Sequence, residues 1–295
     1  MTRLTFHDLS GLSNGLEDYD LELRDKTGHS LKGIALAAAG LSEQAFAGTI
    51  ENRLFAVVPI TLGQGTIPGF CEAVQDIVSF LGCRAEITSS PDVGGLAEAF
   101  ASQADIVFCA DDFDFIAINS ERKSVVHNNQ ATAKAYVTAL KLMTSLSEGR
   151  VLVLGCGQIG QASLAVLLGG DQPVAVYDPD GAKAELWYQS LSPGWKELAE
   201  ILAQFPKNLR EFAAVIDATP AGNILGPENI PPHLFLAAPG VPLGLTPEAH
   251  LRHGHRVIHD PLQLGVAAMV SLSVKRILSR ELEVPSPRFT VRRSW

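Results

Sequence analysis

The sequence has few cysteines, and nothing in their arrangement indicates a disulfide framework or a metal site. The four cysteines stand singly, without the C-x-x-C spacing of zinc and redox sites. The histidines clustered between residues 250 and 259 are expected to lie on a helix end and a strand rather than in a metal site. We therefore expect reduced, mostly buried thiols in a cytoplasmic protein that binds no metal.

The chain also lacks the runs of charge or apolar residues that mark nucleic-acid or membrane partners. Its formal net charge is −9 and the body of the chain contains no basic run, which argues against binding to nucleic acid or to an anionic membrane. The N-terminus has no apolar secretion-signal core, and the longest apolar stretches are shorter than a membrane span. Hydrophobic residues make up 46% of the 295 positions, enough for one large or two medium domains.

The clearest pattern in the chain lies between Arg150 and Asp180. An apolar run of strand length stops at Gly155–Gly160, which fits G-x-G-x-x-G. A helical pattern follows, and a second short apolar run then ends at Asp178. The order of strand, glycine motif, helix, strand and acidic residue predicts a β-α-β unit that binds a dinucleotide.

Each residue of the glycine motif has a physical role in such a turn. Gly155 permits the tight bend, Gly157 lets the backbone approach a pyrophosphate, and Gly160 lets the helix lie close to the sheet. Gln158 and Ile159 begin the helix, where free N–H groups and the helix dipole favour an anion.

Two further positions extend the predicted cofactor site. Asp178 stands at the tip of the second strand, where its carboxylate can accept hydrogen bonds from ribose hydroxyls and would repel a 2′-phosphate. We therefore expect NAD rather than NADP. A later apolar run, residues 213–217, leads to Thr219 and Pro220, which we place beside the nicotinamide half.

The rest of the chain predicts an α/β fold of two domains. Residues 1–148 are expected to form an N-terminal helical and α/β substrate domain, with a helix start near Thr5 and a second helix over residues 31–47. Its strands alternate with helices, which indicates a parallel sheet. Residues 149–295 are expected to form a Rossmann-type, doubly wound NAD-binding domain that ends in an amphipathic helix over 262–278 and an extended tail.

Polar residues cluster at two places ahead of the glycine motif. Asp111 and Asp112 follow a predicted strand, at the sheet edge where ligands bind in α/β proteins. Their carboxylates could anchor an ammonium group, accept a proton, or only cap a loop. Asn128 and Asn129 precede the helix that leads into the glycine motif, a connector that often borders the cleft between two domains.

Several motifs together resemble the pyrrolysine synthase family. In chain order they are LTFHDL, VPITLGQGTIPGF, SSPDVGG, CADDFDFIAIN, HNNQ, VLVLGCGQIG, DATP, APGVP and DPLQLGVAAM. They extend from Leu4 to about Val274, and the VPIT, CADD and HNNQ segments are more specific than the glycine motif.

The resemblance implies a reaction and roles for particular residues. The family oxidises 3-methyl-D-ornithyl-N6-L-lysine at its terminal primary amine with NAD, releases ammonia through a semialdehyde, and closes the pyrroline ring of pyrrolysine. Asp111 matches the family's acidic position and is the first candidate for proton acceptor, with Asp112 second. The N-terminal helix in this family closes over the substrate. By position, the implied substrate contacts are the apolar Leu4 and the polar Thr61, Asn128 and Asn129.

Other readings remain open from the residues. DATPAG and PGVPLGLT would also suit a two-domain NAD(P)-dependent dehydrogenase of the shikimate or dipicolinate type, acting on a small amino or hydroxy acid. Shikimate-type sites pair a lysine with an aspartate, and no lysine of the first half follows a predicted strand in a suitable place. A non-catalytic NAD-sensing module would not need the long α/β stretch ahead of the glycine motif. The expected partner is a small lysine-derived molecule, and a homodimer is a candidate assembly.

Overall fold

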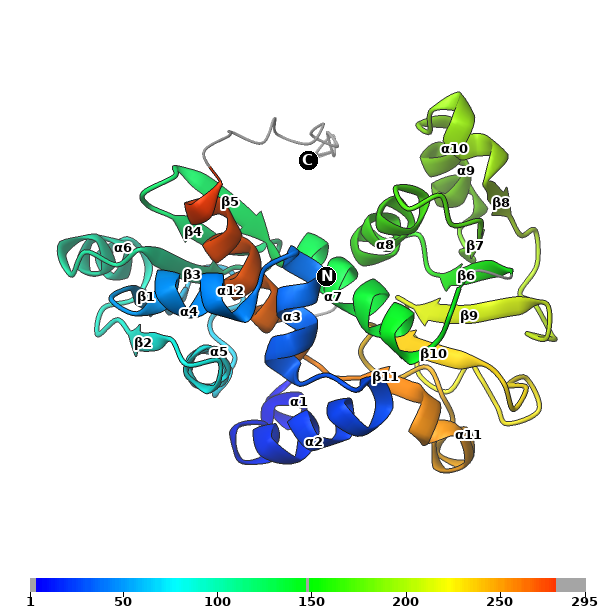
Figure 1. The fold of residues 1–295 in the computed structure, drawn as a ribbon, viewed down its shortest axis with the longest axis horizontal. Helices are drawn as coiled ribbons and strands as arrows, with labels where there is room; N and C mark the ends of the chain where they lie inside the picture. Colours follow the sequence, from blue (N-terminus) through cyan, green and yellow to red (C-terminus); the bar gives the residue numbers. More distant parts are fainter. Residues whose placement is uncertain (1–3, 147–148, 280–295) are drawn as a thin grey trace.

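The computed structural model describes residues 4–146 and 149–279, so the predicted tail lies outside the described residues. Two lobes, each built on its own sheet, stand on either side of helix α7 (Asn128–Met143), as Figure 1 shows. The predicted α/β class, with a Rossmann-type second unit, is confirmed. None of the described helices is long and apolar enough to cross a membrane.

The first lobe contains a five-stranded sheet of order β2-β1-β3-β4-β5. Its elements are α1 (Phe6–Leu9), η1 (Ser13–Gly15), α2 (Leu16–Thr27), α3 (Leu31–Ala39), α4 (Glu43–Ile50), β1 (Leu54–Val58), α5 (Phe70–Phe80), β2 (Arg84–Ile87), α6 (Asp92–Ala101), β3 (Ile106–Ala110), β4 (Phe115–Asn119) and β5 (Ser124–His127). Thr5 and Asp8 form the capping box at the predicted helix start. The helix expected over 31–47 is divided, because Gly40 adopts a left-handed φ of 63° and ends α3.

The first sheet is mixed, whereas the alternation of strands and helices predicted a parallel sheet. Strands β1, β2 and β3 are parallel as expected, but β4 and β5 add to β3 as an antiparallel meander. A tight turn after β3 reverses the chain, closed by a hydrogen bond from the Asp111 N–H to the Asp114 carbonyl. Along β4 buried residues alternate with half-buried ones, the pattern of a strand with one covered face.

The second lobe contains a six-stranded parallel sheet of order β11-β10-β9-β6-β7-β8. Its elements are β6 (Arg150–Leu154), α8 (Gln158–Leu168), β7 (Val174–Tyr177), α9 (Gly181–Gln189), α10 (Pro193–Glu197), β8 (Ala199–Ile201), β9 (Phe212–Asp217), β10 (Phe235–Ala238), α11 (Pro247–His253), η2 (Gly254–Arg256) and β11 (Val257–His259). The strand order reverses between β6 and β9, and ligands bind in doubly wound sheets at the carboxyl edge of such a switch point.

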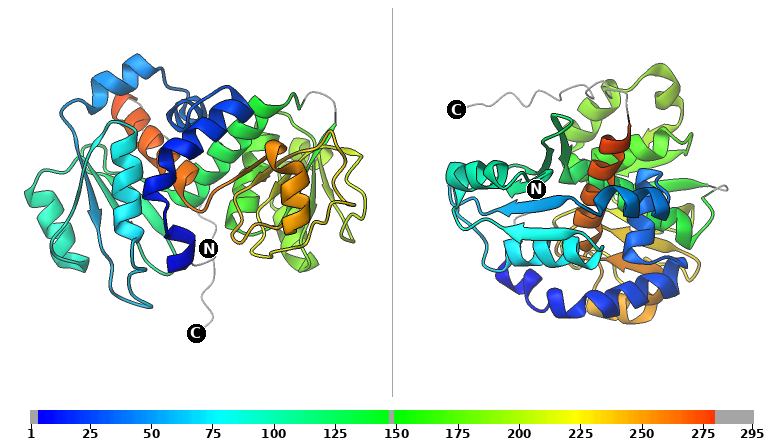
Figure 2. Two further views of the ribbon diagram at one scale, coloured as in Figure 1. Left: turned by 90° about the horizontal axis from the view of Figure 1, so that it is seen from below. Right: turned by 60° about the vertical axis from the view of Figure 1, so that its left-hand side comes forward.

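The last described helix, α12 (Gln263–Leu278), does not lie where the sequence placed it. It packs against α3, α4, α5, β4 and β5 of the first lobe and against α7, and Figure 2 shows it running back among the first-lobe helices. The expectation of an amphipathic helix is also wrong, because every residue from Gln263 to Val274 is buried. Because other elements of the protein surround α12, its polar groups also lie against protein rather than solvent. For example, the Asn119 amide donates to the Ser273 carbonyl at 3.3 Å. The boundary at 148/149 stays a prediction.

This placement predicts a large stability cost for shortening a core side chain of α12. Met269 is fully buried, so Met269→Ala should lower the free energy of unfolding by about 2–5 kcal/mol, from lost burial and the cavity left behind. Urea denaturation measures this change. Leu278→Ala on the same helix is the control, because Leu278 is 45% exposed, and should cost less than about 1 kcal/mol. Equal losses for the two variants would contradict the central position of α12.

Candidate active site

A cavity of about 420 Å³ opens between the carboxyl edges of the two sheets. Its wall includes residues that follow strands in both lobes, the first turns of α5, α7, α8 and α12, and Leu4 from the N-terminal segment. Of the residues selected from the sequence, all except Thr61 and Gly160 line it: Leu4, Asp111, Asp112, Asn128, Asn129, Gly155, Gly157, Gln158, Ile159, Asp178, Thr219 and Pro220. Residues from both halves of the chain are therefore brought together.

The glycine turn between β6 and α8 has the close approaches that its spacing predicts. Gly155 has a left-handed φ of 90°, and a Cβ there would lie 2.9 Å from the Ala218 carbonyl oxygen. A Cβ on Gly160 would lie only 1.9 Å from the Gly155 carbonyl oxygen. Nothing lies within 4 Å of the corresponding position at Gly157, and no side chain caps the N-terminus of α8. Gly160 thus serves helix packing, while Gly157 leaves open space in front of uncapped N–H groups.

Asp178 joins the tip of β7 to this turn. Its Oδ2 accepts a hydrogen bond from the Cys156 N–H at 2.7 Å, and its Oδ1 accepts one from the Asp180 N–H at 2.9 Å. Each carboxylate oxygen can accept a second bond, so Asp178 can still bind hydroxyl groups in the cavity. Burial, and then the charge of Asp178, raise the pKa of the Cys156 thiol to about 11, so this cysteine stays a neutral thiol near pH 7.

Thr219 reaches the cavity from the loop after β9, where a buried carboxylate holds it. Asp217 Oδ1 accepts hydrogen bonds from the Thr219 N–H at 3.1 Å and from its hydroxyl at 2.7 Å. Desolvation raises the pKa of Asp217, against the opposing effect of these bonds. Asp217, the last residue of β9, therefore holds the loop that carries Thr219 and Pro220.

Asp111 lies in the turn after β3, with its side chain exposed at the cavity wall. Its Oδ1 accepts hydrogen bonds from the N–H groups of Phe113 and Asp114, each at 2.8 Å. Within the described residues Oδ2 makes no hydrogen bond. The carboxylate therefore caps its own turn with Oδ1, which is one of the roles left open from the sequence, and its other oxygen has no partner among the described residues.

Asp112 ties the same turn to the glycine loop of residues 61–66. Its Oδ2 accepts a hydrogen bond from the Gln64 N–H at 3.0 Å. A Cβ on Gly63, whose φ is 73°, would lie 2.2 Å from that oxygen. The carboxylate thus occupies the space that a side chain at Gly63 would need, and the loop depends on it for its position.

Thr61 is the predicted substrate contact that the structure does not bring to the cavity. Its N–H and hydroxyl both donate to the Asp92 carboxylate on α6, and these bonds lower the pKa of Asp92. Thr66, at the other end of the loop, lines the cavity and donates its hydroxyl to the Ile60 carbonyl at 3.1 Å. Asp92 is the first residue of α6, so the hydrogen bond from the Thr61 hydroxyl fastens the start of the loop to that helix.

Asn128 and Asn129 form the first turn of α7, at the border of the cavity as their place in the chain predicted. Asn128 is buried, and its Oδ1 accepts a hydrogen bond from the Thr132 hydroxyl at 3.2 Å. Asn129 Oδ1 accepts one from the Gln130 N–H at 2.7 Å. Asn128, Thr132 and Tyr136 follow one another at intervals of four, so one face of α7 carries polar groups along the cavity.

Sequence reasoning missed a buried cluster of two tyrosines and an aspartate. Asp260, which follows β11 and is 4% exposed, accepts hydrogen bonds on Oδ2 from the hydroxyls of Tyr19 at 2.7 Å and Tyr136 at 2.8 Å. Its Oδ1 accepts one from the Leu264 N–H at 3.1 Å. Burial and the charge of Asp260 raise the pKa of both tyrosines well above the usual value, so both stay protonated donors. Tyr136 and Asp260 line the cavity.

The charges around the cavity are mostly negative. The carboxylates of Asp111, Asp112, Asp178 and Asp260 line it, and Lys183 is the one cationic side chain among the described lining residues. Walls of low dielectric concentrate such a field, which favours ligands that carry positive charge. No group of three His, Cys, Asp or Glu residues suited to a metal ion occurs among the described residues.

Comparisons with known proteins agree with the motif resemblance. Residues 8–126 match the model for the N-terminal domain of the pyrrolysine biosynthesis protein PylD. The chain is 28% identical to the pyrrolysine synthase of Methanosarcina acetivorans over 271 residues, which covers 92% of this chain and 98% of the relative. It is 27% identical to that of Methanosarcina barkeri over 270 residues, covering 92% and 97%. The resemblance to pyrrolysine synthases is therefore confirmed.

Two solved structures of dehydrogenases share the fold of this chain. Shikimate dehydrogenase from Aquifex aeolicus superimposes with a TM-score of 0.51 at 13% identity, covering 80% of this chain and 95% of that one. Shikimate 5-dehydrogenase from Thermus thermophilus, in complex with NADP(H) and shikimate, gives 0.50 at 15% identity, covering 78% and 94%. At such identities the likeness shows the fold alone.

The glycine geometry predicts that two similar substitutions differ in their effect on stability. Gly160→Ala places a methyl group against the Gly155 carbonyl, so the turn must shift, and we expect a loss of about 1–3 kcal/mol in the free energy of unfolding. Gly157→Ala meets no neighbour within 4 Å and should cost less than about 0.5 kcal/mol. Urea denaturation of both variants measures this difference. A larger loss for Gly157→Ala would show that the roles of the two glycines are reversed.

Proposed function

We propose, from the similarity to pyrrolysine synthases over 92% of the chain, that this protein is an NAD-dependent dehydrogenase of pyrrolysine biosynthesis. Its substrate would be 3-methyl-D-ornithyl-N6-L-lysine, oxidised at the terminal primary amine to a semialdehyde with release of ammonia, followed by ring closure to pyrrolysine. The main supporting observation is that the glycine turn with Asp178 and the acidic turn after β3 line one cavity.

The residues of the second lobe suit a dinucleotide. The open space at Gly157 and the uncapped start of α8 would accept the pyrophosphate, and Asp178 would accept hydrogen bonds from the adenosine ribose. Thr219 and Pro220 would lie beside the nicotinamide half. NAD, when bound, supplies the acceptor for a hydride.

Asp111 is the proposed proton acceptor. A hydride leaves a carbon next to nitrogen only when the nitrogen lone pair is free to stabilise the developing positive charge, so the substrate ammonium must first lose a proton. Asp111 lines the cavity, its Oδ2 makes no hydrogen bond to the described residues, and its Oδ1 fixes the side chain to its turn. An orientation fixed in this way suits a general base.

The other lining residues would hold the substrate. The proposed substrate carries three ammonium groups and one carboxylate, which matches a cavity dominated by carboxylates. Leu4 would contact its apolar part, and the amides of Asn128 and Asn129 would bind the lysine end. Thr61 would act indirectly, by closing the loop that Asp112 positions.

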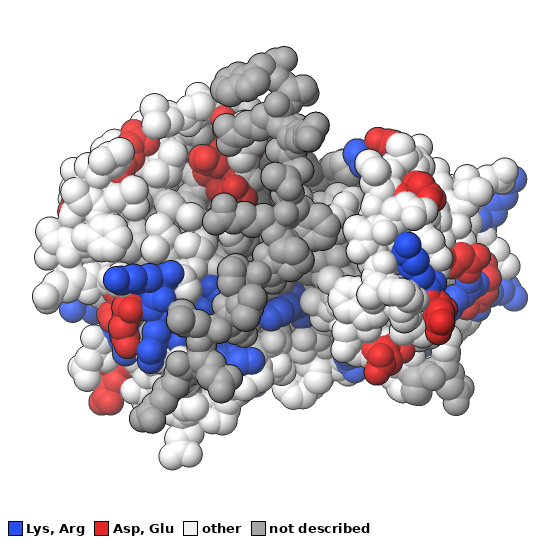
Figure 3. Space-filling view, turned by 90° about the horizontal axis from the view of Figure 1, so that it is seen from above, with Lys and Arg blue, Asp and Glu red and all other residues white. Residues whose placement is uncertain are grey.

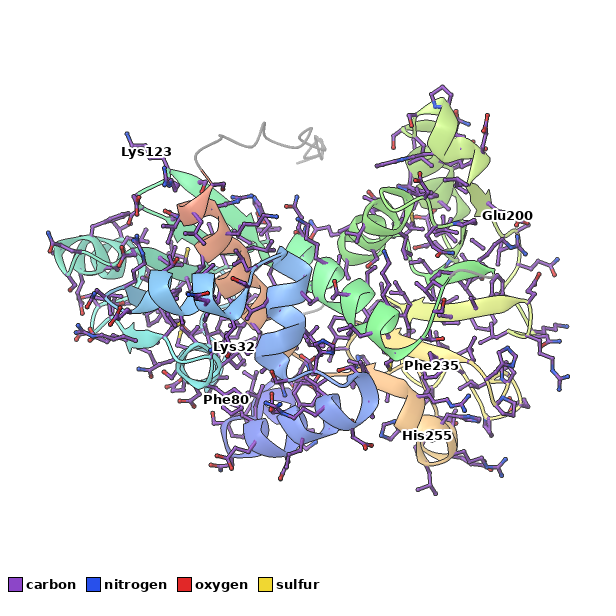
Figure 4. All side chains as sticks on the ribbon, viewed as in Figure 1. Lys32, Phe80, Lys123, Glu200, Phe235 and His255 are labelled. Atoms are coloured by element: carbon purple, nitrogen blue, oxygen red, sulfur yellow. The ribbon has the colours of Figure 1, made fainter. Side chains whose placement is uncertain are left out.

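Another amino-acid or hydroxy-acid dehydrogenase is the second candidate, favoured by the fold shared with shikimate dehydrogenases. Among the described residues, no lysine of the first lobe lines the cavity. Lys123 lies on the β4–β5 turn and points away from the lobe in Figure 4, and Lys32 lies over the Phe46 ring at 5.2 Å. The first lobe thus offers no counterpart of a lysine–aspartate pair in the cavity, which counts against the shikimate type.

The function is tested by NADH absorbance when purified protein and NAD are offered 3-methyl-D-ornithyl-N6-L-lysine or its demethylated analogue. Mass analysis of the product follows. NADH formation with a pyrroline product is the expected result. Demonstrable NAD binding without turnover of either compound would exclude the proposed substrate and favour the second candidate.

Replacing Asp111 should separate cofactor binding from turnover. Asp111→Asn keeps an acceptor for the two turn N–H groups but removes the base, so NAD affinity should be unchanged and kcat should fall by about 100-fold or more. Asp114→Asn, in the same turn but outside the cavity lining, is the matched control and should keep its activity. Unchanged turnover in Asp111→Asn would remove Asp111 from the mechanism.

Asp178 should determine the choice between NAD and NADP. Asp178→Ser removes the charge that would repel a 2′-phosphate, and Lys183 at the same cavity could then attract it. We expect the ratio of NADP to NAD affinity to rise by about tenfold or more. Calorimetric titration with both cofactors measures the ratio. An unaltered ratio would place the adenosine ribose elsewhere.

A further inference from the structure

Asp260 is a buried acidic residue at the cavity that the proposed reaction does not use. Its carboxylate receives three hydrogen bonds, from the Tyr19 and Tyr136 hydroxyls and the Leu264 N–H. These donors come from α2, α7 and α12, so three separate elements fix one side chain in place. Such a site is built around a charge of fixed position.

All the side-chain partners of this carboxylate are hydrogen-bond donors. Hydrogen bonds to a charged acceptor stabilise it, and Asp260 also faces the first turn of α12, where the helix dipole favours an anion. No Lys, Arg or His among the described residues forms an ion pair with Asp260, in contrast to exposed acids such as Glu248, which pairs with Arg252 at 2.7 Å. Its negative charge is therefore not cancelled by a neighbouring cation.

The position of Asp260 relative to the proposed cofactor follows from the strand order. Along the carboxyl edge of the second sheet, the cavity is lined by Asp178 after β7, the glycine turn after β6, Thr219 after β9, Gly240 after β10 and Asp260 after β11. A dinucleotide with its ribose at Asp178 and its pyrophosphate at the glycine turn must extend toward β10 and β11. Its nicotinamide ring then lies at the end of the cavity where Asp260 is.

We infer that Asp260 is a specificity-determining residue that makes the site prefer the oxidised cofactor to the reduced one. The inference rests on the proposed dinucleotide function. The oxidised nicotinamide ring carries a positive charge and the reduced ring is neutral, while the rest of the two molecules is the same. A fixed buried anion near the ring therefore attracts NAD and contributes little to NADH. The same preference would help reduced cofactor to leave after turnover.

The test is a comparison of dissociation constants for NAD and NADH, measured by calorimetry without substrate. In the unaltered protein NAD should bind more tightly than NADH. Asp260→Asn keeps the size and an acceptor oxygen but removes the charge. It should weaken NAD binding by about tenfold, as expected for two opposite charges that are not in direct contact at an effective dielectric near 20. The dissociation constant for NADH should change by less than about twofold.

Asp171→Asn is the matched control, because Asp171 is an exposed acid of the same lobe outside the cavity lining and loses the same unit of charge. It should leave both constants unchanged. Equal weakening of NAD and NADH in Asp260→Asn would overturn the inference and assign Asp260 to packing. Tighter binding of NADH than of NAD by the unaltered protein would also overturn it, even if the variant does not fold. If the unaltered protein binds neither form, the proposed function fails as well.

Discussion

The close packing of α7 against α12 is the contact on which both lobes depend. A Cβ on Gly265 of α12 would lie 2.6 Å from the Thr132 hydroxyl and 2.8 Å from Asn128 Oδ1, both on α7. The two helices can approach this closely only because residue 265 is a glycine. On its other sides α7 contacts α3 of the first lobe and α8 and β10 of the second. The helix that separates the sheets therefore also fixes them relative to each other, and its first turns line the cavity.

The electrostatics of the cavity follow from this arrangement. Asp111 comes from the first lobe, Asp178 from the second, and Asp260 from the segment that passes between them. None of these positions is unusual for its own element, since each follows the end of a strand. Their sum is a cavity with one cation among its described lining residues, while the face in Figure 3 shows basic side chains beside acidic ones. The negative charge of the cavity therefore arises where the two lobes meet.

The sequence was most informative where all determinants lie within one short stretch. The turn at Gly155–Gly160 and the acid at Asp178 were predictable, because strand, glycines, helix and strand follow one another without interruption. The placement of α12 was not, because an apolar helix signals burial but not the surface that covers it. Tyr19 and Asp260 were missed because they meet across 241 positions of chain. Thr61 was misplaced because nothing local shows that its hydroxyl is taken by Asp92.

The return of α12 to the first lobe also bears on how the protein assembles during synthesis. The second lobe, residues 150–259, is continuous in sequence, whereas the first lobe needs residues from both ends of the described chain. Domains usually fold in the order in which they leave the ribosome. Here the first lobe is translated first but can complete its fold only last, because its central helix α12 is translated after the whole second lobe. A growing chain therefore lacks the helix that completes the apolar core of the first lobe until residues 263–278 have been made.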